Sequence, residues 1–247
     1  MKSTRLDTYI LLFCLLTFSP GDKKNKRGSR RSLHLLHILN NSSRTSSRPE
    51  PKPVASPPYH ITVMPPADDP RLRHISDSIR SIPNWPKEGI LFQDITTTLL
   101  DPVAFGHCVD ILYERYKDKK VDVVAGFEAR GLIFGAPLAL RLKCAFVPLR
   151  KPKKLPGETI GEEYTLEYGS DRIEMHVGHV KEGNRVVLVD DLIATGGTMV
   201  AGIKLMKKVK ADIVEAACIL ELPLLKGKDK LVEHQVGLYT MVEKDVL

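Results

Sequence analysis

Short apolar runs alternate with amphipathic segments through the second half of the chain. The runs are rich in β-branched residues and apolar throughout, which is typical of strands that are buried on both faces. Strands are expected over 121–126, 144–149, 185–190, 212–222 and 236–242, and helices over 130–142 and 197–209. Strands separated by helices in this way predict an α/β fold, with a central, mainly parallel sheet flanked by helices.

The segments upstream of this alternation follow a different pattern. Residues 71–82 place apolar side chains on one helical face, and residues 102–116 read as an amphipathic helix. Asp101 is the expected N-cap of that second helix, with Pro102 at its first position. The prolines of residues 50–70 predict a linker without regular structure.

A polar segment rich in lysine, glycine and proline covers residues 150–163. It is expected to be a loop. After it, two short strands at about 164–168 and 172–177 would flank a turn at Gly169 and Ser170.

Charge divides the chain into two parts. Residues 1–60 hold eleven Lys and Arg against three acidic residues, a net charge of +8, while the whole chain carries +7. The remainder is therefore close to neutral, which argues against nucleic acid as a partner. We expect a basic extension without fixed structure over residues 1–63 and one folded domain over residues 64–247.

The extension has three interpretations. Its apolar run at 9–18 is too short to span a membrane and resembles the core of a signal peptide. The residues after it are rich in arginine and serine and poor in acids, as organelle transit peptides are. An untargeted tail is the third alternative. The four cysteines form no CxxC pair, which favours a reducing compartment. We therefore predict a cytoplasmic protein with no membrane partner, and chloroplast import as the alternative.

The stretch VVLVDDLIATGGTM at 186–199 carries the strongest chemical signal. It matches neither a dinucleotide-binding fingerprint nor a Walker loop. Glycines, threonine hydroxyls and the start of a helix together form a site for one phosphate monoester. The predicted phosphate-binding residues are Ala194, Thr195, Gly196, Gly197 and Thr198.

Asp190 and Asp191 precede that loop, at the end of a buried strand. Their carboxylates can accept hydrogen bonds from two ribose hydroxyls, or hold Mg²⁺, directly or through water. The alternative is an acidic pair that caps a helix beside a Gly-Gly turn. The combination of strand, acids and loop favours a sugar phosphate.

The same stretch resembles the ribose-phosphate motif of the type I phosphoribosyltransferases, which use 5-phosphoribosyl-1-diphosphate (PRPP). Further segments resemble the adenine phosphoribosyltransferases, and especially their plant forms, in order and spacing. These segments are WPKEGILFQDITTTLLDP (85–102), AGFEARGLIFG (125–135), VPLRKPKKLPG (147–157), EEYTLEYG (162–169) and ELPLLKG (221–227). The resemblance covers about residues 70–242 and does not extend to residues 1–63.

The resemblance implies a type I phosphoribosyltransferase fold with a small N-terminal hood and a flexible lid loop. It implies transfer of the phosphoribosyl group from PRPP to adenine, which gives AMP and diphosphate in purine salvage. Mg²⁺ as cofactor and a homodimer are implied as well.

Residue roles also follow from the resemblance. Glu167 would meet N7 of the base and handle its proton, although a Glu near a hairpin is usually a solvated strand residue. Arg130 would bind diphosphate, as would Arg150 and Lys154 from the lid. For these last two the alternative is an ordinary charged surface loop.

The hood would contact the base through three residues, Leu91, Phe92 and Gln93. Phe92 offers a face for stacking, or is ordinary core. Related enzymes often carry arginine where this chain has Gln93, so we expect a backbone contact there.

Two rival functions would explain parts of this pattern. An enzyme for hypoxanthine, guanine or orotate would keep the Thr-Gly-Gly-Thr loop but lack the TLEYG and ILFQD segments. A non-enzymatic PRPP or nucleotide sensor would need neither a basic lid nor a proton-handling carboxylate. The presence of these features favours the adenine enzyme.

Overall fold

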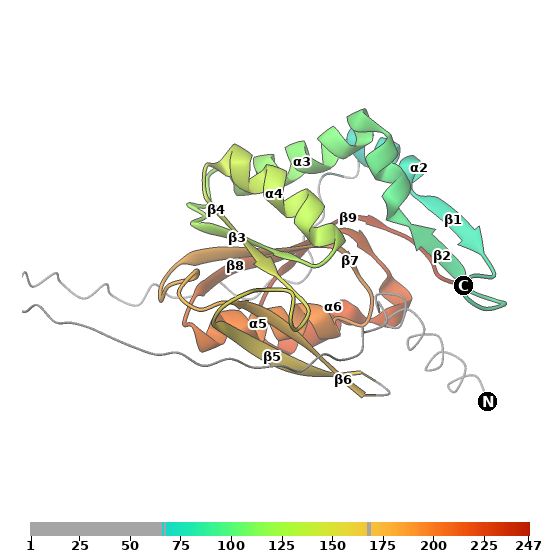
Figure 1. Ribbon diagram of the computed structural model, residues 1–247. Helices are drawn as coiled ribbons and strands as arrows, with labels where there is room; N and C mark the ends of the chain where they lie inside the picture. The colour runs from blue at the N-terminus through green and yellow to red at the C-terminus, as the bar shows by residue number, and fades with distance from the viewer. Residues whose placement is uncertain (1–65, 67, 167–168) are drawn as a thin grey trace, which may run out of the picture.

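The computed structural model describes residue 66, residues 68–166 and residues 169–247 (Figure 1). Its centre is a parallel five-stranded sheet in the order β4-β3-β7-β8-β9. These strands are β3 (Val123–Phe127), β4 (Ala145–Leu149), β7 (Arg185–Ile193), β8 (Asp212–Glu221) and β9 (Leu238–Glu243). The predicted fold class is confirmed.

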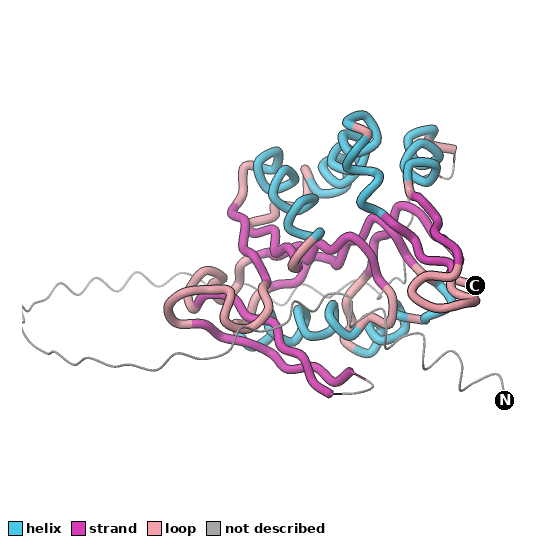
Figure 2. The backbone as a smooth tube through the Cα atoms, turned by 45° about the vertical axis from the view of Figure 1, so that its right-hand side comes forward, coloured by secondary structure: helices cyan, strands magenta, loops and turns pink. Residues whose placement is uncertain are grey.

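Helices cover both faces of this sheet (Figures 1 and 2). One face carries α2 (Pro70–Ser78), α3 (Pro102–Tyr116) and α4 (Arg130–Leu142), and the other carries α5 (Gly197–Lys208) and α6 (Gly227–Glu233). Short 3-10 helices, η1 (Ile95–Leu100) and η2 (Pro223–Leu225), complete the helical segments.

Two antiparallel hairpins extend from the sheet. The first pairs β1 (Arg80–Pro83) with β2 (Leu91–Asp94), and the second pairs β5 (Thr159–Leu166) with β6 (Gly169–His176). The first is the hood expected from the resemblance. The second lies on the α5 side of the sheet (Figure 1).

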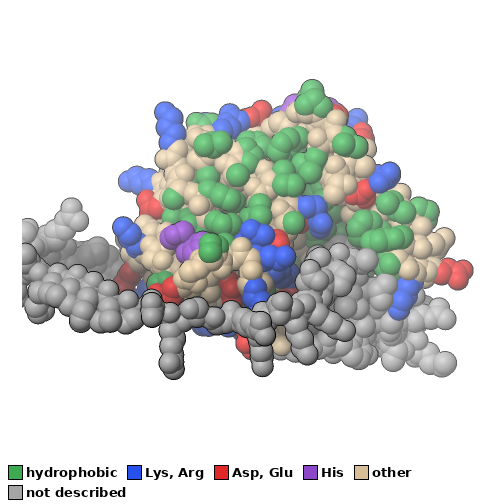
Figure 3. All heavy atoms as spheres, in the orientation of Figure 1, with side chains coloured by type: hydrophobic (Ala, Val, Ile, Leu, Met, Phe, Trp, Pro, Cys, Tyr) green, Lys and Arg blue, Asp and Glu red, His purple; other side chains and the backbone are tan. Residues whose placement is uncertain are grey.

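The outward face of α4 is apolar. Ile133 and Leu140 are exposed by 40% and 79%, and Val103 at the start of α3 by 54%. Hydrophobic side chains gather on this side of the molecule (Figure 3). Ile133 and Leu140 are seven residues apart and therefore lie on one stripe of the helix.

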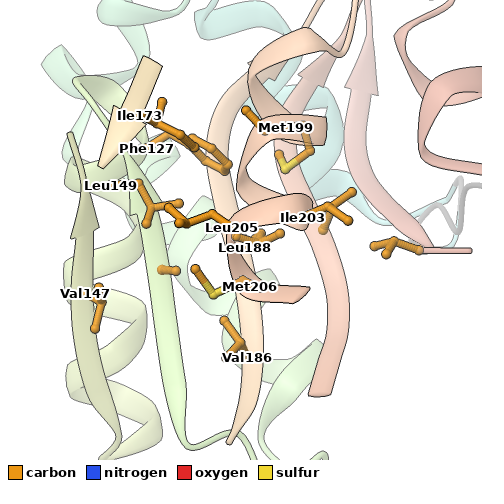
Figure 4. Close-up of a cluster of buried hydrophobic side chains, with 14 of the residues drawn as sticks. Phe127, Val147, Leu149, Ile173, Val186, Leu188, Met199, Ile203, Leu205 and Met206 are labelled. Carbon is orange, nitrogen blue, oxygen red and sulfur yellow. The ribbon is translucent and has the colours of Figure 1, made fainter. Parts of the chain in front are cut away.

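The core forms two layers because successive residues of β7 point to opposite faces of the sheet. Val186 and Leu188 pack with α5, beside Phe127 and Met206 (Figure 4). Val187 and Val189 pack with α3 and α4 in the other layer. The buried, all-apolar strand predicted at 185–190 thus supports both layers.

Most element predictions are confirmed, and α3 and α4 have the predicted bounds. Asp101 caps α3 by accepting hydrogen bonds from the amides of Val103 and Ala104. The helix predicted over 71–82 is wrong at its end. It stops at Ser78, because the chain turns extended at Ile79 and residues 80–83 pair with β2.

The second hairpin also differs from the prediction. Its first strand begins at Thr159, inside the segment predicted to be a loop, because eight residues of each strand find partners in register. Gly169 lies within β6 rather than in a turn. The sequence pattern also gave no indication of α6. The boundary predicted at residue 63 lies outside the described residues and stays a prediction.

No helix in the described part of the chain combines the length and the apolar composition that crossing a bilayer requires.

Candidate active site

A pocket of about 480 Å³ opens at the carboxyl ends of β3 and β7, where ligands bind in open α/β sheets. Its wall combines the loop after β7 with residues from the hood, the start of α4, the segment after β4 and the β5–β6 hairpin. The lining residues are Trp85, Phe92, Glu128, Ala129, Arg130, Lys151, Tyr164, Asp171 and Asp190 to Met199.

All five predicted phosphate-binding residues lie in this wall. Gly196 adopts a left-handed φ of 78°, a conformation that glycine accepts without strain. The helix α5 starts at Gly197, and no side chain caps its first amides. Uncapped amides at a helix N-terminus are groups that can bind an anion, and the predicted Thr195 and Thr198 stand beside them.

Tyr164 closes one side of the predicted phosphate-binding loop, residues 194–198, which is called the phosphate loop below. Its ring lies 3.7 Å from the position that a Cβ on Gly197 would take. Its hydroxyl donates to Asp171, at 2.9 Å. The hairpin thereby contacts the loop directly.

Asp190 and Asp191 lie together with Arg130 near the carboxyl end of the central strand β7. Arg130 Nε donates to Asp191 Oδ2 over 2.6 Å, and Asp191 is buried. Removal from bulk water, together with the charge of Asp191, raises the pKa of Asp190 well above its ordinary value. The pair therefore lies beside the half-buried guanidinium of Arg130, and neither carboxylate caps a helix.

Gly131 explains how α4 comes so close to these acids. A Cβ on Gly131 would lie 2.6 Å from the carbonyl oxygen of Val189 and 3.0 Å from Asp190 Cα. Only glycine allows the helix start to pack on the end of β7, and this packing brings Arg130 beside Asp191.

The basic cluster after β4 is divided between two surroundings. Arg150 Nε donates to Glu128 Oε2 at 2.8 Å, and neither Arg150 nor Lys154 is among the residues that line the pocket. Lys151 does line the pocket and pairs with Asp171. The sequence signal for Lys151 was its membership of the same cluster.

The hood brings an aromatic pair to the pocket. Phe92 and Trp85 both line it, with ring centroids 4.4 Å apart in an edge-to-face arrangement. Phe92 is half-buried rather than part of the core. Trp85, the only tryptophan of the chain, stands at the start of the quoted segment 85–102 and could have been found from that signal.

The two other predicted hood residues lie behind this pair. Gln93 is buried, accepts a hydrogen bond from Ser81 and donates to the carbonyl oxygen of Asp245 at 2.7 Å. The amide of Leu91 donates to the carbonyl oxygen of Val246. Neither side chain lines the pocket. Glu167 lies outside the described residues.

Sequence reasoning missed several lining residues. Tyr164 stands inside the quoted segment EEYTLEYG, so a signal for it existed. Glu128 is in FEARG, next to the predicted Arg130. Asp171 reaches the pocket only because strand register places it opposite Tyr164, and no local pattern could have indicated that pairing.

The donor set is compatible with Mg²⁺. No group of three or more His, Cys, Asp or Glu side chains suited to a metal ion occurs among the described residues. Mg²⁺ does not need such a cage, because it commonly binds through one or two carboxylates together with substrate phosphates and water. Asp190 and Asp191 provide a carboxylate pair in the pocket wall.

The fold and the site define a transferase of the phosphoribosyl group. The family model described as "Phosphoribosyl transferase domain" matches residues 96–242. Adenine phosphoribosyltransferase 1 of Triticum aestivum is 60% identical over 180 residues, which cover 73% of this chain and 99% of the relative. The chain belongs to the adenine phosphoribosyltransferase family.

Solved structures agree with this assignment. Adenine phosphoribosyltransferase from Thermoanaerobacter pseudethanolicus aligns with a TM-score of 0.66 at 45% identity, covering 70% of this chain and 99% of that one. The Trypanosoma brucei enzyme, solved with AMP, pyrophosphate and ribose-5-phosphate, aligns with a TM-score of 0.68 at 30% identity, covering 74% and 83%. The predicted family is confirmed.

Proposed function

We propose that the pocket transfers the 5-phosphoribosyl group from PRPP to adenine, giving AMP and diphosphate for purine salvage. One observation carries this proposal: a glycine loop at a helix N-terminus, a carboxylate pair beside a half-buried arginine and an aromatic pair share a single pocket wall. Each of these features suits one part of the substrates.

In the proposed reaction, N9 of adenine attacks C1 of the ribose. The bond from C1 to the diphosphate oxygen breaks and leaves its electron pair on the diphosphate. The N9–C1 bond forms through an oxocarbenium-like transition state, and N9 loses its proton. The chain must therefore hold the ribose, stabilise the leaving group and manage one proton.

The phosphate loop would bind the 5-phosphate of PRPP through the amides of Gly196, Gly197 and Thr198 and the threonine hydroxyls. Asp190 and Asp191 would accept hydrogen bonds from the ribose hydroxyls. Arg130 donates a hydrogen bond to Asp191, so its guanidinium would bind the diphosphate beside these carboxylates. Lys151 adds a second cation in the wall.

Adenine would bind at the hood, against Phe92 and Trp85. A purine ring stacked on an aromatic side chain gains about 1–3 kcal/mol. We retain Glu167 as the residue that meets N7, and Arg150 and Lys154 as lid residues that reach diphosphate when the lid closes. For Arg150, such closure would break its ion pair with Glu128.

Mg²⁺ is proposed as the cofactor, held by Asp190 and Asp191 and by the substrate. When bound, it would neutralise part of the charge on the diphosphate. The carboxylates would keep their place through Arg130 and through the amide of Asp191, which donates to Asp190.

A homodimer is proposed as well. The exposed stripe of Ile133 and Leu140, continued by Val103, is the kind of surface that a second copy would cover. Sedimentation velocity tests it: Leu140→Glu should yield monomers, with Leu224→Glu on an exposed site of η2 as the control. A wild-type monomer at micromolar concentration would contradict it.

For location we propose the cytoplasm, with the chloroplast as the alternative. One relative, 58% identical over 175 residues, is named adenine phosphoribosyltransferase 1, chloroplastic, of Arabidopsis thaliana. Fluorescent fusions of the full chain and of a chain that lacks residues 1–63 would separate the two. Plastid import of the full chain alone would support the alternative.

The activity is tested by PRPP-dependent conversion of labelled adenine to AMP, with hypoxanthine and guanine in parallel and with and without Mg²⁺. Adenine alone should be converted, and only with Mg²⁺. No turnover of any base would contradict the proposal. Glu167→Gln as active as wild type would remove that residue from proton handling.

A further inference from the structure

Two glycines from distant segments pack backbone against backbone behind the phosphate loop. A Cβ on Gly227 would lie 2.2 Å from the carbonyl oxygen of Ala194 and 2.9 Å from the amide nitrogen of Gly196. A Cβ on Gly196 would in turn lie 2.4 Å from the carbonyl oxygen of Gly227. Neither backbone can shift without moving the other.

Gly196 needs to be glycine for its positive φ alone, but Gly227 does not. Its φ lies outside the left-handed region, so an alanine there would be unstrained in its own backbone. The requirement for glycine at 227 therefore comes from the phosphate loop that it touches.

An ion pair beside Gly227 anchors this segment. Glu221, at the end of β8, is 1% exposed, and Nζ of the half-buried Lys228 lies 3.1 Å from its Oε1. Lys228 follows Gly227 directly. The amide of Leu222 donates to the carbonyl oxygen of Ile193 at 3.1 Å, which ties the same segment to the end of β7.

We propose that the segment from Glu221 to Lys228 is a positioning element for the 5-phosphate site. Glu221 and Lys228 fix Gly227, and Gly227 fixes the curvature of the Ala194–Gly196 backbone, whose following amides would bind the phosphate. None of the three residues lines the pocket. This inference rests on the proposed function, because it names what controls affinity at one end of that site.

The positioning element should affect the binding of PRPP but not the binding of adenine. A Cβ only 2.2 Å from a backbone oxygen forces the loop or the segment to move. A displaced loop would weaken the binding of every ligand that carries a 5-phosphate, whereas the base would bind at the hood. The effect should therefore appear in the KM for PRPP and in the affinity for ribose 5-phosphate. The KM for adenine should stay the same.

The test is Gly227→Ala, compared with wild type by steady-state kinetics and by calorimetric titration with ribose 5-phosphate. We expect the KM for PRPP and the Kd for ribose 5-phosphate to rise at least tenfold, with the KM for adenine within twofold of wild type. Gly106→Ala in α3 is the matched control, because a Cβ there meets nothing within 4 Å. It should leave all three constants unchanged.

Lys228 provides the second variant in case Gly227→Ala does not fold. Lys228→Met should raise the KM for PRPP several-fold, and Lys228→Arg should restore it, because arginine keeps the charge beside Glu221. A ribose 5-phosphate Kd unchanged in both Gly227→Ala and Lys228→Met overturns the inference. Equal changes in the constants for PRPP and adenine overturn it too.

AMP formation by the wild-type protein distinguishes a failure of the proposed function from a failure of the positioning element. If wild type forms no AMP, the proposed function fails, while the ratio of ribose 5-phosphate affinities between variant and wild type still tests the positioning element.

Discussion

Where we propose that the phosphate binds, backbone packs on backbone, whereas at the end proposed for the base two aromatic side chains stand on a small hairpin. The proposed phosphate loop leaves β7 in the middle of the sheet, and Gly227 packs against it from behind. The hood strand β2 forms a two-stranded sheet with β1 and makes hydrogen bonds to Asp245 and Val246. The first end is fixed by the fold. The second depends on a few side-chain contacts, and base preference can therefore change there without rebuilding the sheet.

The largest effect should come from Arg130, which we propose binds the diphosphate group. Arg130→Ala should lower kcat by about 10²–10³, the cost of removing one group that stabilises developing charge. Arg130→Lys should recover only part of it, because lysine lacks the guanidinium fork. Arg141→Ala, on the exposed end of the same helix, is the control for rate measurements. A kcat within threefold of wild type would remove Arg130 from catalysis.

A second test separates function from stability at the phosphate end. Asp190→Asn should weaken PRPP binding by about tenfold or more, since a carboxylate with charge-assisted hydrogen bonds is lost. It should also raise the melting temperature. Folding raises the pKa of Asp190, so the folded state holds that proton more tightly than the unfolded chain does. The destabilisation is therefore present above the raised pKa and absent below the unfolded value of about 3.9.

The stability gain of Asp190→Asn should consequently be largest at pH 8 and shrink as the pH falls towards 5. Thermal unfolding at both values, followed by circular dichroism, measures it. A stability gain that does not depend on pH would contradict the conclusion that ionisation of the Asp190 carboxyl group destabilises the folded state.

At the base end, Phe92→Ala should raise the KM for adenine about tenfold, within the range for loss of one stacking partner. The KM for PRPP should change by less than twofold, because Phe92 belongs to the hood and not to the loop after β7. Phe92→Tyr keeps the ring and is the matched control. Equal changes in both constants would show that the two ends are not independent.

The smallest effect is expected behind the hood. Gln93→Leu removes the hydrogen bonds to Ser81 and Asp245 while keeping a side chain of similar size. It should raise the KM for adenine two- to fourfold and leave that for PRPP alone. Removal of residues 245–247 should also raise the KM for adenine. Additive effects in the combined variant would show that the two changes act independently.

The two ends also differ in how well the sequence predicts them. The phosphate loop, the Asp190–Asp191 pair and Arg130 belong to contiguous motifs at strand ends. Parallel strands bring their carboxyl ends to the same side of the sheet. At the base end, Gln93 bonds to a residue 152 positions away. The pattern of residues did not predict the hood hairpin and assigned residues 80–82 to a helix, because the hairpin strands stabilise each other through pairing rather than through local preference. Arg150 illustrates the same limit: its charge was evident, but its partner Glu128 was set by tertiary packing.

The order of strands in the central sheet has a consequence for folding. β7 pairs with β3 on one side, with Val186 opposite Val123, although the whole β5–β6 hairpin lies between them in the chain. Closing such a long loop costs chain entropy before any contact rewards it, so this pairing is a slow step. The phosphate loop and Arg130 meet only once β3 and β7 are side by side. Recovery of ligand binding after dilution from denaturant therefore reports the pairing of β3 with β7.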